Sequence, residues 1–263
     1  MNGSWVDSIC FEPSSRRAIR PATNELQITA RLASPLRLQG LVTEFAGVLY
    51  DDTAWQRWLL QQLAKIGLQT QYGPFFQVFE RDYLPAVHCG RDYWEALRDF
   101  LVASGLTRGQ IDEVEAAGQS RYHQFEECVR PLPGVTAALM QFAARNVPIA
   151  ILSNSPYTAQ ELQRRLSNMG IADRFVTVLS SRDLGFRKPD RASYEAALHA
   201  LHLPPNATAY IGKKEDELRG AAKAGLTTIA INYEPGTRAD ILIDRFDQLP
   251  RAIWPEGNAK IAG

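Results

Sequence analysis

Three polar residues stand beside apolar runs, where their side chains could do chemistry: Glu44, Ser153 and Lys188. A carboxylate such as that of Glu44 can attack a substrate and form a covalent intermediate. A hydroxyl at the end of a strand and before a helix, as expected for Ser153, can hydrogen-bond an anion because the helix N-terminus favours negative charge. Lys188 precedes Pro189, which favours an extended backbone and partly fixes the direction of the lysine side chain. Together these residues predict a site that handles anionic groups.

Alternating strands and helices are expected to position these residues. Apolar runs predict strands at 38–49, 148–152, 175–179, 209–211 and 227–231, and helical spacing predicts helices at 135–146, 159–169, 191–201 and 218–224. This repeat predicts an α/β fold with a doubly wound parallel sheet. Such sheets place ligands at the carboxyl ends of their strands, so the residues there are the first candidates for chemistry.

A stretch without predicted strands, residues 53–129, interrupts this pattern. It carries four apolar faces at helical spacing, which indicates a small helical bundle. Its aromatic residues could line a substrate pocket, although such clusters more often form a core. These residues are Trp55, Trp58, Phe75, Phe76 and Phe79. His88 and Cys89 could form a reactive pair, but a lone His-Cys dipeptide is more often incidental.

Composition narrows the function classes. The chain has 263 residues, 45% of them apolar, and a formal net charge of zero, so no general field draws in nucleic acid or an anionic membrane. Its three cysteines, Cys10, Cys89 and Cys128, favour reduced thiols over a disulfide framework. No apolar run is long enough to span a membrane, and the N-terminus lacks the pattern of a secretory signal. We therefore expect a cytoplasmic protein.

Four segments are similar in order and spacing to the motifs of the haloacid dehalogenase (HAD) superfamily. They are residues 42–51, 149–155, 184–190 and 210–217, the last followed by a matching tail at 220–225. The resemblance covers about residues 38–250. It implies a Rossmannoid core formed by residues 37–52 and 130–255, with a helical cap inserted at 53–129. Residues 1–36, in which 25–32 could form an edge strand, are expected to be an N-terminal extension, and residues 256–263 a tail.

The resemblance also implies a role for each motif residue. At most positions where the family has an acidic residue, this chain has a different one. Glu44 stands where most of the family's phosphatases have a nucleophilic Asp, and Ala46 where they have the Asp that shuttles a proton. Ser153 matches the hydroxyl that hydrogen-bonds the transferring phosphoryl group, with help from neighbouring backbone N–H groups. Lys188 matches the lysine that neutralises both the nucleophile and the phosphate.

The fourth motif lacks its usual metal-binding pair of Asp residues. Lys213 and Glu217 occupy those positions, and Asp216 lies one residue early for the second. Magnesium requires oxygen ligands in tight octahedral geometry, and a protonated lysine offers no lone pair. We expect no metal in the site, with the ammonium of Lys213 in its place and paired with Glu44 or Glu217. The alternative is that Lys213 and Lys214 extend into solvent.

Two functions remain open. The first is a HAD-like protein that has lost standard phosphatase chemistry and needs no cofactor. It would bind a small phosphorylated or carboxylated molecule, or a protein partner through the cap. The residues expected to contact such a ligand are Ser153, Asn154, Lys188 and Lys213. The second is an active phosphatase or dehalogenase with Glu44 as nucleophile or base, in which case Mg²⁺ is the expected cofactor and Glu217 or Asp216 its expected ligand.

Overall fold

A seven-stranded sheet lies at the centre of the protein. The structure is a computed structural model that describes residues 27–28, 38–68, 71–127 and 129–254. The strand order is β1-β7-β6-β5-β2-β3-β4, with β1 antiparallel to β7 and the other six strands parallel. The strands are β1 (Gln27–Ile28), β2 (Gly40–Thr43), β3 (Ile149–Ser153), β4 (Thr177–Ser180), β5 (Thr208–Gly212), β6 (Thr227–Ile231) and β7 (Ile241–Ile243). The predicted α/β fold is therefore confirmed.

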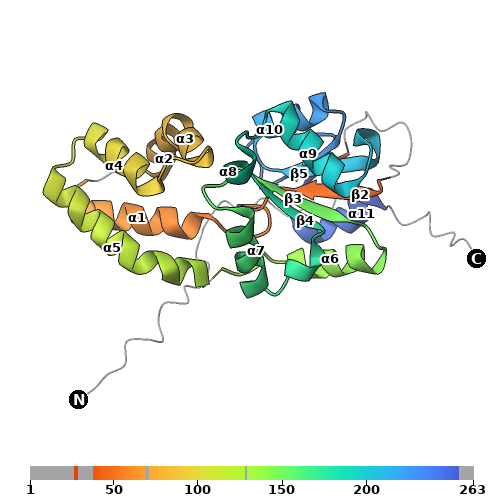
Figure 1. The fold of residues 1–263 in the computed structure, drawn as a ribbon, viewed down its shortest axis with the longest axis horizontal. Coiled ribbons are helices and arrows are strands. Elements are labelled where there is room, and N and C mark those ends of the chain that lie inside the picture. Colours follow the sequence, from red (N-terminus) through yellow and green to blue (C-terminus); the bar gives the residue numbers. More distant parts are fainter. Residues whose placement is uncertain (1–26, 29–37, 69–70, 128, 255–263) are drawn as a thin grey trace, which may run out of the picture.

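Helices cover both faces of the sheet (Figure 1). One face packs against α6 (Val135–Ala144), α7 (Ala159–Asn168) and α11 (Leu249–Ile253). The opposite face packs against α9 (Arg191–Leu201) and α10 (Glu215–Lys223). Every residue of β2, β3 and β5 is buried, as expected for parallel strands covered on both sides. Because β2 lies between β3 and β5, their carboxyl ends meet at one edge of the sheet.

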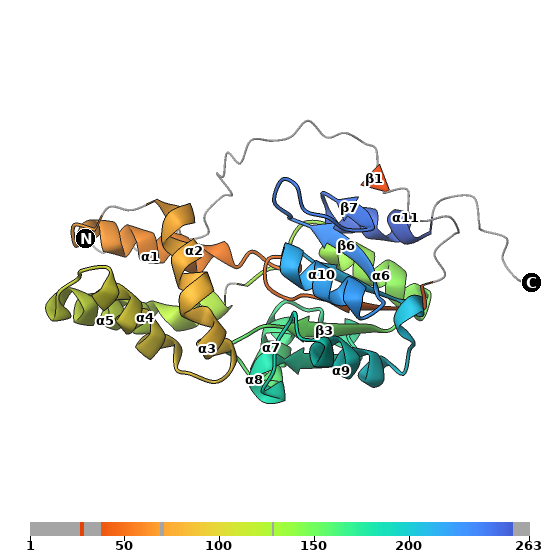
Figure 2. The same cartoon turned by 90° about the horizontal axis from the view of Figure 1, so that it is seen from above.

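A second group of helices lies beside the sheet, as Figures 1 and 2 show. It comprises α1 (Thr53–Lys65), α2 (Tyr72–Asp82), α3 (Leu84–His88), α4 (Tyr93–Ala103) and α5 (Arg108–Glu127), and is called the helical group below. These helices share an apolar core of their own, rich in aromatic residues. Four apolar faces were expected here, and the fifth helix arises because Pro85 in the first turn of α3 starts a new helix after α2 ends.

Several element boundaries differ from the sequence prediction. The strand predicted at 38–49 ends at Thr43, because the chain turns over residues 45–50 with Gly47 in the left-handed region, at φ 71°. Helix α10 starts at Glu215, three residues earlier than expected, and its acidic first turn suits a helix N-terminus. Strand β7 was not predicted. Of the predicted edge strand at 25–32, Gln27–Ile28 forms β1, and the remainder lies outside the described residues.

The remaining short elements complete the described fold. Helix α8 (Ser181–Leu184) follows β4, and single 3-10 turns occur at Ala172–Arg174, Pro205–Ala207 and Phe246–Gln248. Within the part of the chain that the structure describes, no helix combines the length and apolar character needed to cross a membrane.

Close packing of α10 leads to a prediction about Gly220. A β-carbon added at Gly220 would lie 2.8 Å from both the Tyr194 hydroxyl and the Pro189 β-carbon. Gly220→Ala should therefore lower the free energy of unfolding by about 1–3 kcal/mol, the usual cost of overpacking. The matched control is Gly109→Ala in α5, where an added β-carbon has no neighbour within 4 Å and should be neutral or slightly stabilising. Urea unfolding measures both, and equal effects would show that α10 tolerates extra volume.

Candidate functional site

The predicted convergence of Glu44, Ser153 and Lys188 is present in the structure. The Glu44 carboxylate follows β2 and is nearly buried. Its Oε1 atom accepts hydrogen bonds from the Ser153 hydroxyl and the Phe45 backbone N–H, both at 2.7 Å. Its Oε2 atom is ion-paired with the Lys188 ammonium. Three donors from three segments therefore hold a single carboxylate.

Asn154 fixes the backbone of Lys188. The Lys188 N–H donates to Asn154 Oδ1 and the Asn154 side-chain amide donates to the Lys188 carbonyl, each at 2.9 Å. The same amide lies 3.3 Å from Glu217 Oε1. Asn154 was predicted as a ligand contact, and it does line the cavity described below, but the bonds seen here are those of a residue that positions Lys188.

The Lys188 ammonium is fully buried between two glutamates. Besides Glu44, it lies 3.0 Å from Glu217 Oε2 and 3.0 Å from the Tyr210 hydroxyl. Burial lowers the pKa of Lys188, but Glu217 and Glu44 together outweigh burial and leave the pKa above its ordinary value. The ammonium is therefore charged at neutral pH, and the two carboxylates provide its counter-charge.

Two tyrosines that the sequence did not single out complete this network. The Tyr210 hydroxyl donates to Glu217 Oε2 at 2.7 Å, and the Tyr194 hydroxyl donates to the Glu217 carbonyl at 2.6 Å. Burial raises the pKa of Glu217, but Lys188, Lys214 and the bond from Tyr210 outweigh it and lower the pKa below 4.5. Tyr210 lies within an apolar strand, where a buried hydroxyl needs a partner, and that requirement is the signal that could have identified it.

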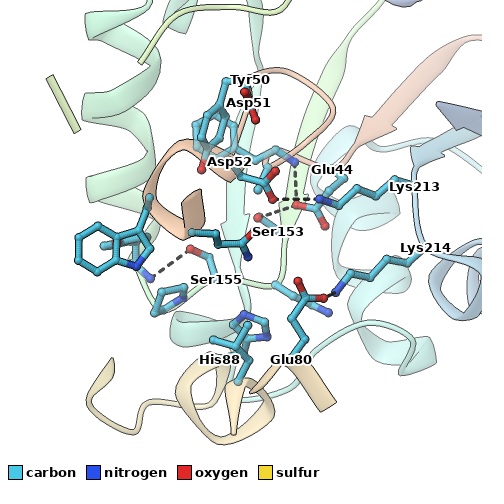
Figure 3. Close-up of a pocket in the computed structure, with 18 of the residues that line it drawn as sticks. Glu44, Tyr50, Asp51, Asp52, Glu80, His88, Ser153, Ser155, Lys213 and Lys214 are labelled. Atoms are coloured by element: carbon cyan, nitrogen blue, oxygen red, sulfur yellow. Dashed lines mark hydrogen bonds and ion pairs between the residues drawn. The ribbon is translucent and has the colours of Figure 1, made fainter. Parts of the chain in front are cut away.

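The predicted pairing of Lys213 with Glu44 or Glu217 is wrong. The Lys213 ammonium instead lies 2.9 Å from Oδ2 of Asp52, which precedes α1 (Figure 3). It occupies the space above Gly47, where an added β-carbon would lie 2.3 Å from the nitrogen. Glu44 and Glu217 already share Lys188, and the partner of Lys213 comes from the residue just before the helical group. The solvent alternative is also wrong for Lys213, whose side chain is only 26% exposed.

The side-chain oxygens available as ligands do not fit Mg²⁺, the ion that the fold family implies. Both Glu44 oxygens are engaged by donors, Ala46 has no side-chain oxygen, and Glu217 Oε2 is bonded to Tyr210 and paired with Lys188. Asp216 uses one oxygen to accept from the Glu217 N–H. Within the described ranges, no three His, Cys, Asp or Glu side chains are grouped so that they could hold a metal ion.

A cavity of about 240 Å³ lies between this network and the helical group (Figure 3). Its lining combines polar side chains with aromatic and aliphatic ones. The polar lining includes Glu44, Ser153, Asn154, Lys213, Lys214 and Glu217, and the apolar lining includes Trp55, Phe76, Phe79, Leu84 and Tyr93. Of the aromatic residues predicted to line a pocket or form a core, Trp55, Phe76 and Phe79 line the cavity, whereas Trp58 and Phe75 only pack in the core of the helical group. His88 lines the cavity too, whereas Cys89 is exposed, and Cys10 and Cys128 lie outside the described residues.

Comparison with known proteins points to one family. The family model described as haloacid dehalogenase-like hydrolase matches residues 44–225. A glyceraldehyde 3-phosphate phosphatase of Methanothermobacter thermautotrophicus is 29% identical over 121 residues, 45% of this chain and 53% of that protein. A phosphoglycolate phosphatase of Cereibacter sphaeroides is 37% identical over 94 residues, 36% of this chain and 41% of that protein. The match therefore spans about half the length of these curated relatives.

Solved structures share the fold at low sequence identity. A protein described as a predicted phosphoglycolate phosphatase from Haemophilus somnus gives a TM-score of 0.64 at 17% identity, covering 83% of this chain and 99% of that one. The L-2-haloacid dehalogenase of Xanthobacter autotrophicus, with chloropropionic acid covalently bound, gives 0.60 at 18% identity with the same coverage. At these identities the likeness shows the fold alone.

The bonds to Glu44 predict chemical rescue by small anions. Glu44→Ala should lower the free energy of unfolding by about 3–5 kcal/mol, because it leaves a buried ammonium with one counter-charge fewer. Formate or acetate should then raise the melting temperature of the variant more than that of wild type, by filling the space beside Ser153 and Lys188. The control is Glu195→Ala, which removes an exposed ion pair with Arg191. If formate or acetate raised the melting temperatures of wild type, Glu44→Ala and Glu195→Ala equally, the removal of Glu44 would not have created an anion site.

The lowered pKa of Glu217 predicts acid sensitivity. A carboxylate whose pKa is lower in the folded than in the unfolded chain contributes stability that is present above about 4.5 and is lost as pH falls through the folded value. Unfolding free energy should therefore decline below about pH 5 in wild type, with a slope of up to about 1.4 kcal/mol per pH unit for this group. Glu217→Gln should show a shallower decline in urea titrations. If the free energy of unfolding declined equally in wild type and Glu217→Gln, the acid sensitivity would come from other groups.

Proposed function

Since this chain belongs to the haloacid dehalogenase-like hydrolase family, we propose that it has kept the family's fold and lost its magnesium-dependent phosphatase chemistry. In place of turnover, it binds a small organic anion in the cavity between the sheet and the helical group. A small ligand is favoured over a protein partner because the described residues form a cavity lined by both polar and apolar side chains.

The observation that carries this proposal is the position of the Glu44 carboxylate. The Ser153 hydroxyl, the Phe45 N–H and the Lys188 ammonium all point to it. In the family, the corresponding hydroxyl, a backbone N–H and the lysine act on the transferring phosphoryl group. Glu44 therefore acts as an internal anion that saturates the donors a phosphate would need.

The same geometry weakens Glu44 as a nucleophile. Its side chain is one methylene longer than that of Asp, and misplacement of a reacting atom by about 1 Å can cost about 100-fold in rate. Ala46 supplies no general acid or base, a loss worth about 10²–10⁴-fold. Loss of metal assistance removes several further kcal/mol of transition-state stabilisation. These effects compound.

Metal-independent hydrolysis by Glu44 is the alternative function. In its favour, Glu44 lines the cavity and its carboxylate is held in one orientation. Against it, hydrogen bonds and an ion pair engage both oxygens and lower their nucleophilicity. The curated relatives are phosphatases of phosphoglycolate and glyceraldehyde 3-phosphate, which supports a small anion as ligand without supporting turnover here.

Phosphatase assays test the proposal directly. With p-nitrophenyl phosphate or phosphoglycolate, millimolar Mg²⁺ should not stimulate release of phosphate by the full chain, because the donor set offers no magnesium site. Ser153→Ala serves as the matched control, since any turnover from contaminating host phosphatases should be equal in both preparations. A magnesium-stimulated kcat of about 1 s⁻¹ or more, ordinary for enzymes, that is lost in Ser153→Ala would overturn the proposal.

A further inference from the structure

The second lysine of the loop after β5, Lys214, has a partner that can be exchanged. Its ammonium lies 3.3 Å from Oε2 of Glu80 in α2, and both side chains are more than one-third exposed (Figure 3). Ion pairs exposed in this way contribute little to stability, so replacing Glu80 by another carboxylate costs little. Both residues line the cavity. Lys214 thus differs from Lys188, which is fully buried and already neutralised by two glutamates.

His88, at the end of α3, lies on the same side of the cavity (Figure 3). Its Nδ1 atom is buried and has no hydrogen-bond partner among the described residues. Burial lowers the pKa of His88 to about 3, and the nearby charges of Lys214, Arg187 and Lys188 add to this effect. The imidazole is therefore neutral at pH 7, and in the tautomer protonated at Nδ1 it can donate a hydrogen bond to an anion. A buried polar atom without a partner is unfavourable, so a ligand that brings one is favoured.

Part of the apolar lining, called the apolar wall below, comes from the same two helices. Phe76 and Phe79 precede Glu80 on α2, and Leu84 starts α3, which His88 ends. An anion held at Lys214 can therefore carry a ring or branched chain that packs against this wall. The volume of about 240 Å³ lies below the ~300–1,000 Å³ of pockets for drug-sized ligands, which limits the ligand to about one ring and a short chain.

We propose that the cavity binds an aromatic monocarboxylate, whose carboxylate replaces Glu80 as the partner of Lys214 beside His88. Exchanging one carboxylate for another leaves the charge around Lys214 unchanged. A phosphate dianion would add a second negative charge near Glu217 and Glu44. This inference rests on the proposed function, because Glu44 keeps the ligand's anionic group away from Ser153 and Lys188.

Calorimetric titration of the full chain with phenylacetate at low ionic strength tests the assignment. Phenylacetate should bind with saturation, and acetate, which lacks the ring, at least about tenfold more weakly. Lys214→Met should weaken phenylacetate binding by about 10-fold or more, as expected for loss of a charge-assisted bond. His88→Ala should weaken it several-fold. Glu80→Gln should strengthen it, because the competing carboxylate is gone, and a merely structural role of Glu80 would not produce that increase. Lys223→Met, an exposed lysine outside the cavity, is the control.

The possible results separate this inference from the function on which it rests. No saturation by phenylacetate up to about 10 mM, or binding unchanged in Lys214→Met, would overturn the subsite. Weakening by Ser153→Ala instead would also overturn it, while leaving anion binding in place. Phenyl phosphate binding more than tenfold tighter than phenylacetate would overturn the choice of a carboxylate. Magnesium-dependent release of phenol from phenyl phosphate by wild type, absent in Ser153→Ala, would overturn the proposed function instead.

Discussion

A buried ammonium, that of Lys188, is the charge around which the site is organised. Removing a lysine side chain from water is costly unless opposite charges and hydrogen bonds replace the solvent. Here two carboxylates and a tyrosine hydroxyl surround the nitrogen, while Asn154 holds the backbone. Glu44 follows β2, Asn154 follows β3, Tyr210 lies on β5, and Glu217 lies in the first turn of α10. The need to balance the charge of Lys188 therefore holds the ends of the central strands together.

The proposed loss of the metal that the fold family implies would follow from the charges around Lys188. Carboxylates crowded at strand ends would repel one another unless cations neutralise them. Lys188 is paired with both Glu44 and Glu217, Lys214 lowers the pKa of Glu217 as a further nearby cation, and Lys213 is paired with Asp52. The family's arrangement of an anion beside a lysine and a hydroxyl is kept, but the anion belongs to the protein. Under the proposed function, stability and catalysis make opposite demands on Glu44, because the bonds that anchor its carboxylate would occupy the groups that donate to a substrate.

The sequence predicted the features of this fold that depend on local pattern. Apolar runs and helical spacing identified five parallel strands, and the motif order placed Glu44, Ser153 and Lys188 at one edge. The partner of Lys213 could not be predicted in this way, because Asp52 lies 161 residues away and its approach depends on how α1 leaves the sheet. Tyr210 was not predicted, because it lies within an apolar strand and reads as a core residue. Short elements such as β7 and α3 carry too few residues for a period to be recognised.

The two adjacent lysines after β5 have a consequence for the whole molecule. Lys213 binds the start of α1 through Asp52, and Lys214 binds α2 through Glu80, so one loop of the sheet unit holds the helical group at two points. A third tie, from the Ser181 hydroxyl to the His88 carbonyl, is uncharged. Mobile ions screen exposed charge pairs over about 8 Å at physiological ionic strength. The exposed Lys214–Glu80 pair should therefore weaken as ionic strength rises, whereas the less exposed Lys213–Asp52 pair and the uncharged hydrogen bond should change less.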